Sequence, residues 1–466
     1  MPRLLLSLLA AAFVAAMLSI GALAEEAPVL DAQIAEPSGG EVWMLSDIDR
    51  TTKRAFLDGA ALTVTAEAPA SGLYLIWDAP APAAWRLTAD GREIARPGEE
   101  IGFLHEFILL DPPASRLTLE WDGPAVLCEL TPLGAGTPPA WVQRWRPPEG
   151  RADLLLFSTH ADDEHLFFGG ILPRTAADGR YEIQVAYLVN HNDEPYRPHE
   201  LLNGLWEVGV RRYPIIPDFP DRYSGSLAHA KTIYDAQALI DYQVGLIRRF
   251  SPQVIVGQDL NGEYGHGMHM LGAHCLLESV PLAAEGAQGW NTPKLYLHLY
   301  PHQQILLNYD APLSAFEGKT AFQMAVSGFA KHKSQQSFFA VEQWGPYDCR
   351  KFGLARTTVG PDEHKDDLFE HLISYSEQLR FAEAAASSSQ AAAEAEAERI
   401  RQEALTRSAA AEAQRTRILY LPDATSDRLY AWIGSPAKAA LALGGIGLSA
   451  AALLGFLFWR SRRKRR

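Results

Sequence analysis

Residues 154–170 read LLLFSTHADDEHLFFGG, an apolar run that passes directly into histidine, aspartate and glutamate. A short, continuous apolar run is typical of a parallel strand that is buried on both faces. Three similar runs, at 183–189, 254–257 and 295–300, are separated by longer segments with helical spacing. This alternation predicts a Rossmann-like, doubly wound α/β domain over residues 149–377.

Residues that can bind a metal follow two of these strands. His160, Asp162 and Asp163 come directly after the first strand. His266 and His269 come after the third, one helical turn apart, so they share a helix face. Ligands of open α/β sheets bind at the carboxyl ends of the strands. These positions predict a His/Asp/His set with an open fourth position, as catalytic zinc requires, beside an aspartate that can act on water.

Each cluster also has a purely structural interpretation. Residues 162–164 would suit the exposed first turn of a helix, where the helix dipole favours carboxylates. His266 and His269 would then be ordinary surface histidines. His274 and Cys275, further along the expected helix, are predicted to be packing residues. Because both clusters stand at the ends of predicted strands, the metal site is favoured over these alternatives.

Four segments carry short motifs in a fixed order. They are His-Ala-Asp-Asp-Glu with Gly-Gly in 153–170, Arg-x-x-Glu in 197–209, Tyr-Gly-His-Gly-Met-His in 264–269 and His-x-Ser-Gln in 331–335. Together these segments resemble the PIG-L/LmbE-like zinc-dependent N-deacetylases. The likeness covers about residues 150–340 and implies that family's fold there.

The resemblance implies zinc as the cofactor and N-deacetylation as the reaction. It implies roles for eight residues: zinc ligands His160, Asp163 and His269, the general base Asp162, the carbonyl-polarising His266, the substrate-binding Arg197, and Glu164 and Asp259 as supports of the ligands. Asp162 would take a proton from water while zinc acts as a Lewis acid. A protonated His266 would stabilise the charge that develops in the transition state.

Two residues depart from the family pattern. Ala161 stands where the family has proline, which relaxes the loop but removes no ligand. Met268 stands where the family has aspartate, so a carboxylate that could keep a neighbouring histidine protonated is absent. Asp259 or Glu263 would have to supply that negative charge to His266.

The predicted substrate is an N-acetylglucosamine-type sugar in a glycan, glycolipid or glycoconjugate. Two alternatives stay open: a zinc amidase of other specificity, and a non-catalytic cell-surface protein that binds glycans or acts as a scaffold. The 42 Lys and Arg residues against 56 Asp and Glu residues give a formal net charge of −14, which does not favour a nucleic-acid partner. No Gly-x-Gly-x-x-Gly follows the first strand, so a dehydrogenase is not expected.

Both ends of the chain carry predicted processing or membrane signals. Residues 1–24 are predicted to be a secretory signal peptide, and 439–459 an uncharged transmembrane helix followed by a basic cytoplasmic tail at 460–466. This predicts a single-pass protein of the cell membrane whose catalytic body lies on the extracytoplasmic side. A buried core helix and a processed sorting signal are the alternatives for 439–459. Residues 378–438 are predicted to be an Ala/Glu-rich helical stalk or a disordered linker.

Residues 25–148 form a region of a different kind. Short apolar or alternating runs, such as 117–121 and 125–130, are punctuated by turn residues, which predicts an all-β, jelly-roll-like sandwich. Asp122-Gly123 between these two runs predicts a two-residue hairpin.

Three tryptophans of this region, Trp77, Trp85 and Trp121, have two possible roles. Aromatic rings suit the faces of sugars, so the region could be a carbohydrate-binding module. We favour the other interpretation, in which these large side chains fill the core of the sandwich.

Overall fold

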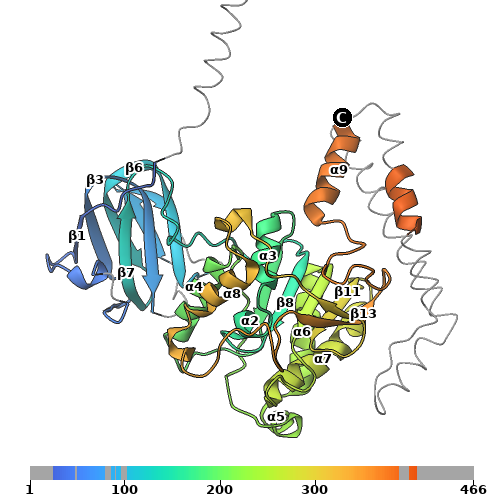
Figure 1. The fold of residues 1–466 in the computed structure, drawn as a ribbon. Coiled ribbons are helices and arrows are strands. Elements are labelled where there is room, and N and C mark those ends of the chain that lie inside the picture. The colour runs from blue at the N-terminus through green and yellow to red at the C-terminus, as the bar shows by residue number, and fades with distance from the viewer. Residues whose placement is uncertain are drawn as a thin grey trace, which may run out of the picture. The chain divides into compact units, whose positions relative to one another are not determined.

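The computed structural model describes residues 25–47, 50–78, 85–89, 91–95, 102–387 and 398–406. These all belong to one compact unit, Met1–Ala410 (Figure 1). The predicted signal peptide at 1–24, the predicted membrane span at 439–459 and most of the predicted stalk lie outside the described residues. Within the described ranges, none of the helices is both long and apolar enough to span a membrane.

The first part of the chain folds as an antiparallel sheet. Its strand order is β2-β7-β3-β6-β4-β5, and β1 pairs with β3. The strands are β1 (Ala32–Ala35), β2 (Arg54–Phe56), β3 (Ala61–Trp77), β4 (Trp85–Ala89), β5 (Arg92–Ala95), β6 (His105–Trp121) and β7 (Ala125–Leu133).

Two long strands, β3 and β6, pair with each other along most of their length. Their register shifts between Thr65 and Gly72, where the ladder is irregular. Before the irregularity β3 also pairs with β1, and after it β3 pairs with β7. Irregularities of this kind bend a strand, so one pair of strands can contribute to both layers of a sandwich.

The three tryptophans lie inside this β region. Trp77 and Trp85 are fully buried, and Trp121 is 1% exposed. The ring centroid of Trp77 lies 5.7 Å from that of Trp85 and 6.4 Å from that of Trp121. The favoured interpretation as core residues is therefore confirmed, and these rings have no free face to offer a sugar.

The prediction of a two-residue hairpin at Asp122-Gly123 is wrong. Among the pairings of the described strands, β6 joins β3 and β4, whereas β7 joins β3 and β2. The turn thus connects strands that are not neighbours. The ring of Trp121, which precedes the turn, stacks on Phe56 of β2 at 4.5 Å, so a tertiary contact overrides the local turn signal.

Glu106 of β6 is a buried carboxyl in this region. Its Oε2 accepts a hydrogen bond from Trp77 Nε1 at 3.0 Å, and burial raises its pKa to about 7. The folded state therefore binds a proton that the unfolded chain releases near pH 4.5. The protonated Glu106 thus adds to the free energy of unfolding. This added stability is present in full below pH 4.5 and is lost as pH rises through about 7.

The Glu106→Gln protein is expected to lose this pH dependence. Between pH 5 and pH 8 the free energy of unfolding of the parent protein should fall by up to about 3 kcal/mol more than that of the variant. Urea midpoints followed by tryptophan fluorescence at the two pH values measure the difference. Glu120→Gln, on the same strand with its side chain 41% exposed, is the control. An identical pH dependence in the parent and Glu106→Gln proteins would contradict the prediction.

The second sheet is mixed, with the order β12-β13-β11-β10-β8-β9. Its strands are β8 (Leu154–Ser158), β9 (Ile183–Tyr187), β10 (Val254–Gly257), β11 (Lys294–His298), β12 (Gln304–Leu306) and β13 (Lys351–Thr357). The four apolar runs singled out in the sequence are β8 to β11, and these strands are parallel. Strand β13, which the sequence did not predict, adds to β11 in the antiparallel direction.

Helices cover both faces of the mixed sheet (Figure 1). Leu154 and Leu156 of β8 face one core together with residues of α3, α4 and α8, and Leu155 and Phe157 face another with residues of α6 and α7. The labelled helices are α2 (Asp163–Leu166), α3 (Ile171–Asp178), α4 (Arg197–Glu207), α5 (Leu227–Ile233), α6 (Ala236–Phe250), α7 (Gly267–Ala283), α8 (Ala321–Phe329) and α9 (Tyr375–Ser387), with 3-10 turns η1 (Trp43–Leu45), η2 (Ser314–Phe316) and η3 (Lys333–Gln335). Residues 398–406, within the predicted stalk, are also helical.

Strand β8 lies between β9 and β10. After β8 the chain forms β9 on one side of it, and it then crosses back to form β10 on the other side. Such a reversal leaves a crevice beyond the carboxyl ends of the two central strands. The segments that follow β8 and β10, which carry the predicted metal ligands, meet there.

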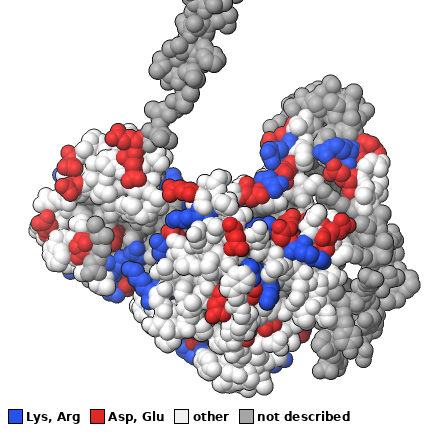
Figure 2. All heavy atoms as spheres, viewed as in Figure 1, with Lys and Arg blue, Asp and Glu red and all other residues white. Residues whose placement is uncertain are grey.

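The surface charges are mixed. On the face drawn in Figure 2, acidic and basic side chains are interspersed and do not gather into one large basic patch.

Candidate active site

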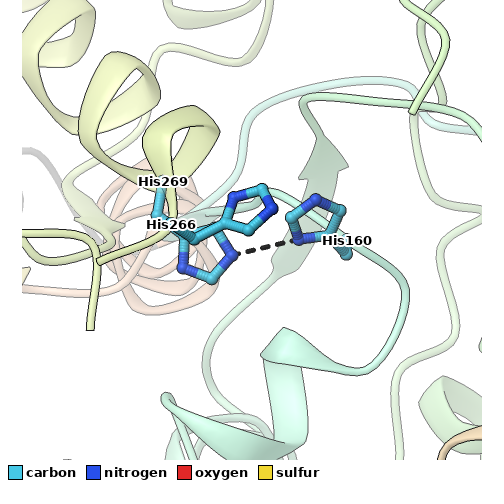
Figure 3. A group of neighbouring side chains, drawn as sticks. All are labelled: His160, His266 and His269. Atoms are coloured by element: carbon cyan, nitrogen blue, oxygen red, sulfur yellow. Dashed lines mark hydrogen bonds between the residues drawn. The ribbon is translucent and has the colours of Figure 1, made fainter. Parts of the chain in front are cut away.

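Three predicted ligands meet beyond the ends of β8 and β10. His160 Nδ1 lies 3.0 Å from Asp163 Oδ2 and 3.0 Å from His269 Nε2. His269 Nε2 lies 3.1 Å from the same Asp163 oxygen. The three donor atoms thus form a nearly equilateral triangle, and Figure 3 shows the two histidines turned toward each other.

This triangle suits zinc. Donors at zinc–ligand distances of about 2.0–2.1 Å and tetrahedral angles are about 3.3 Å apart, close to the separations seen here. Two imidazoles and one carboxylate are also a donor set of catalytic zinc sites.

The charge of the site favours a cation as well. Burial opposes protonation, but nearby carboxylates outweigh it: Asp163 with Asp221 raises the pKa of His160 to about 10, and Asp163 with Glu263 raises that of His269 to about 9. The histidines in turn hold the pKa of Asp163 well below its usual value, against the effect of burial. The pocket thus stabilises positive charge at the centre of the triangle, where a divalent cation would take the place of protons.

His266 lies beside this triangle and caps the start of α7. Its ring centroid is 4.6 Å from that of His160 and 4.8 Å from that of His269 (Figure 3). Donor atoms of all three histidines lie within 4.8 Å of one another, so His266 is also within reach of a metal. Its buried Nδ1 has no hydrogen-bond partner among the described residues.

The surroundings of His266 favour its neutral imidazole. Burial first, and then His160 and His269, lower the pKa of His266 to about 3. The two acidic residues proposed to replace the missing aspartate have other partners: Glu263 binds His269, and the Asp259 carboxylate accepts a hydrogen bond from Asn261. A neutral imidazole can still donate one N–H to a substrate oxygen.

Asp162 lies in the same loop but outside the triangle. Its φ of 128° is a conformation that residues other than glycine rarely adopt. Strained positions of this kind persist where the surroundings enforce them, often at active sites. Burial, followed by the charge of Asp163, raises the pKa of Asp162 to about 7, a value suited to a general base.

Arg197 of α4 holds this loop. Its Nη2 donates a hydrogen bond to the carbonyl oxygen of Ala161 and lies 3.7 Å from Asp162 Oδ1. The side chain is buried. Through these contacts Arg197 positions Asp162. That Arg197 also binds the substrate stays a prediction.

The two outer motifs of the sequence contact each other. Glu200 of α4 accepts hydrogen bonds from Ser334 N at 2.9 Å and Ser334 Oγ at 2.6 Å. The Arg-x-x-Glu and His-x-Ser-Gln motifs thus join helix α4 to the segment after α8, on the side of the site that carries Arg197.

Glu164 lies directly behind the ligand loop, as expected of a supporting residue. Its Oε2 accepts a hydrogen bond from Asp162 N at 2.8 Å. Its Oε1 lies 3.2 Å from His332 Nε2 and 3.4 Å from His165 Nε2, and all three side chains are fully buried. These contacts connect the loop after β8 to the His-x-Ser-Gln segment.

Asp259, expected to support the ligands, hydrogen-bonds to none of them, and Glu263 contacts His269 instead. Among the described residues, the Asp259 carboxylate contacts only Asn261, at 3.4 Å, and the Asp259 backbone N–H donates to Glu263. Glu263 Oε2 lies 2.7 Å from His269 Nδ1, and its Oε1 lies 3.0 Å from His298 Nδ1. A carboxylate on the second nitrogen of a metal-binding histidine fixes the ring and raises its basicity.

Sequence reasoning missed two further partners of the ligands. Gln258 Nε2 donates to Asp163 Oδ2 at 3.0 Å. Asp221 Oδ1 lies 3.4 Å from His160 Nε2, and its other oxygen lies 3.4 Å from His191 Nδ1. Gln258 directly follows β10, so its position was a usable signal. Asp221 comes from a loop far from both motifs, and nothing local marks it.

The Glu263→Gln protein is expected to bind zinc about 10- to 100-fold more weakly than the parent, because a neutral amide orients His269 without adding to its basicity. Titration against a competing chelator measures the affinity. Asp259→Asn, which alters a carboxylate with no ligand contact, should bind zinc like the parent. Equal affinities in all three proteins would exclude the support by Glu263.

The Gly-Gly pair after the ligand loop has a packing role. Gly169 has a φ of 49°, and a Cβ atom there would lie 2.6 Å from Cys349 Sγ. A Cβ atom at Gly170 would lie 2.7 Å from Ala321 Cβ. Only glycine lets α2 and α3 follow each other this close to α8 and the segment before β13.

No family model matches the chain. A 1D-myo-inositol 2-acetamido-2-deoxy-alpha-D-glucopyranoside deacetylase from Streptomyces avermitilis is 29% identical over 181 residues, which cover 32% of this chain and 61% of the relative. The enzyme of the same name from Streptomyces scabiei is 26% identical over 209 residues, with 37% and 64% covered. The chain thus spans less than two thirds of these curated relatives.

Solved structures show a partial likeness. The N,N'-diacetylchitobiose deacetylase from Pyrococcus horikoshii is 16% identical, with a TM-score of 0.30, and the match covers 40% of this chain and 71% of that one. A conserved protein from Thermus thermophilus is 20% identical, with a TM-score of 0.31 and 40% and 80% covered.

Proposed function

Because the region around residues 150–340 belongs to the PIG-L/LmbE-like N-deacetylases, we propose that this protein hydrolyses the N-acetyl group of an N-acetylglucosamine-type sugar. The sugar would be part of a glycan, glycolipid or glycoconjugate. The observation that carries this proposal is the triangle of His160, Asp163 and His269 with Asp162 in the same loop. The curated relatives are named for deacetylating a 2-acetamido-2-deoxy-glucopyranoside, an N-acetylated amino sugar.

In this mechanism His160, Asp163 and His269 would hold zinc, which would supply Lewis acidity when bound. Asp162 takes a proton from the water that attacks the acetamide carbon. A pKa of about 7 lets its carboxylate accept that proton and release it again at neutral pH. Arg197 keeps the Asp162 loop in place through Ala161 and so positions the base.

His266 and Asp162 complete the reaction. As a neutral imidazole, His266 donates an N–H to the carbonyl oxygen, where negative charge develops in the transition state. The carbon–nitrogen bond then breaks, and Asp162 returns its proton to the departing amine. Water and the acetamide are consumed, and acetate and a free amino sugar are formed.

The first test is acetate release from N-acetylglucosamine oligomers by the full chain, before and after chelation and again after zinc is restored. Acetate release that follows zinc content supports the proposal. Release from acetylated peptides but not from sugars would favour an amidase of other specificity. Stoichiometric zinc without any acetate release would favour a binding or scaffold role.

We also propose that the catalytic body lies outside the cell membrane and is anchored by residues 439–459. The support is the sequence: an apolar N-terminal segment at 1–24, and a C-terminal apolar segment followed by a basic tail. Before digestion the protein should sediment with the membrane fraction. Protease added to cells stripped of their wall and any outer membrane should then remove the catalytic body. Full protection of the catalytic body in these cells, with digestion after lysis, would contradict this location.

A further inference from the structure

Behind the ligand loop lies a second group of side chains that could hold a metal ion. Glu164 and His165 belong to α2, and His332 lies between α8 and η3. One donor atom of each residue lies within 4.8 Å of the other two. All three side chains are fully buried. The mechanism above gives none of them a chemical role, so the group needs another explanation.

The polar atoms of this group lack the partners that burial normally requires. Among the described residues, Oε1 of Glu164 and both ring nitrogens of His165 and of His332 are buried without a hydrogen bond. Nearly all buried polar atoms in folded proteins have one, because an unsatisfied atom loses its hydration without compensation. A cation would satisfy the carboxylate oxygen and one nitrogen of each ring at once.

The distances within the group suit zinc. Glu164 Oε1 lies 3.2 Å from His332 Nε2 and 3.4 Å from His165 Nε2. Although these atoms are close, the rings are not aligned for hydrogen bonds to the oxygen. Donors at zinc–ligand distances of about 2.0–2.1 Å with tetrahedral angles are about 3.3 Å apart, and imidazole and carboxylate are both zinc ligands. Both separations thus match a shared ion better than they match hydrogen bonds.

A glycine leaves space next to the two rings. A Cβ atom at Gly204 of α4 would lie 2.6 Å from His165 Nε2 and 2.8 Å from His332 Nε2. These distances are too short for a carbon atom, whereas zinc binds imidazole nitrogen at about 2.0–2.1 Å. Both Nε2 atoms therefore border the same small space, which suits an ion but not a methyl group.

Tyr187, the last residue of β9, provides a further oxygen. Its buried hydroxyl has no hydrogen-bond partner among the described residues, and Glu164 is the charged residue that acts on it most strongly. Structural zinc sites take four ligands and are closed to solvent, whereas catalytic sites keep an open position. A group of four fully buried side chains therefore indicates a structural site, unlike the triangle at the crevice.

We propose that Glu164, His165 and His332 bind a second zinc ion, which stabilises the fold and takes no part in the reaction. The ion connects α2 to the His-x-Ser-Gln segment after α8. The other oxygen of Glu164 accepts the hydrogen bond from Asp162 N at 2.8 Å, so the ion also fixes the loop of the general base. This inference goes beyond the proposed deacetylase function and does not depend on it.

The test begins with zinc per chain, measured by elemental analysis of the full chain. The parent protein should hold two ions. A chelator should remove the ion of the triangle from the folded protein, whereas the second ion should leave only on unfolding, because its ligands are fully buried. The His269→Gln protein, in which the triangle is broken, should retain one ion.

Variants in the His269→Gln background test the ligands of the retained ion. Adding Glu164→Gln or His332→Gln should remove it. Glutamine has the shape of glutamate and keeps an oxygen for Asp162 N, so Glu164→Gln removes the charge of the ligand with little change in packing. Adding His274→Gln instead, at a partly buried histidine of α7, is the matched control and should leave the ion in place.

X-ray absorption at the zinc edge of the His269→Gln protein tests the site without altering it, and should show two imidazole ligands. One ion per parent chain, lost in His269→Gln, would overturn the inference while the deacetylase function stands. A retained ion without two imidazole ligands, or one that Glu164→Gln and His332→Gln both keep, would also overturn it. Two ions without any acetate release would instead contradict the proposed function and leave the second site in place.

Discussion

The Asp162→Asn protein is expected to release acetate about 10²- to 10⁴-fold more slowly than the parent, the usual effect of removing a general base. Asparagine nearly matches aspartate in shape, and the ligand triangle does not include residue 162. Zinc content should therefore stay the same. The readouts are kcat for acetate release and zinc per chain, measured on the same samples.

The pairing of these two measurements makes the Asp162 result interpretable. A slow protein with full zinc places Asp162 in the chemical step. A slow protein without zinc would mean that the substitution disturbs the ligand loop instead. Unchanged kcat would exclude Asp162 as the base. Arg197→Lys is a useful companion, because a lysine cannot reproduce the planar contacts of Arg197 with Ala161 and should lower kcat less than Asp162→Asn does.

The His269→Gln protein is expected to lose the zinc of the triangle and, with it, acetate release. Its affinity should fall by more than the roughly 100-fold limit for residues that only orient a ligand. His269 is fully buried between Asp163 and Glu263, so both carboxylates also lose a partner in this variant. We expect a loss of about 1–3 kcal/mol in the free energy of unfolding as well.

A histidine on the same helix provides the control for this variant. His274 of α7 is only partly buried and has no contact with the triangle, so His274→Gln should keep both zinc and activity. His266→Gln separates the two possible ligand sets. If it keeps zinc but loses activity, His266 acts on the substrate. If it loses zinc as His269→Gln does, His266 is a ligand.

The parallel part of the fold could be predicted because its signal is local. Each of the strands β8 to β11 is mostly apolar and buried, since both of its faces are covered by helices. Strand β13 gives no such signal, because four of its residues are only partly buried and it lies toward the edge. The pairing of β6 with β3 and β4, rather than with β7, depends on contacts between distant residues, which a turn dipeptide does not encode.

The site residues also divide into those with a local sequence signal and those that only tertiary contacts bring in. His160, Asp162 and Asp163 follow β8 within five residues, and His266 and His269 stand at the start of α7, after β10. Two strand ends therefore brought these residues together. Asp221 could not be found this way, because its loop has no motif and reaches His160 only in the folded chain. The protonation state of His266 was also out of reach, since it depends on burial and on the neighbouring histidines.

The backbone of Asp162 sets stability against activity at a single position. At a φ of 128°, glycine would relieve a conformational cost of about 1–3 kcal/mol that aspartate bears. A laboratory selection for heat resistance alone would therefore be expected to enrich Asp162→Gly, and to discard the catalytic base in doing so. Directed evolution of this protein for thermal stability therefore needs a parallel screen for turnover. Without that screen it would select a stable protein that is inactive.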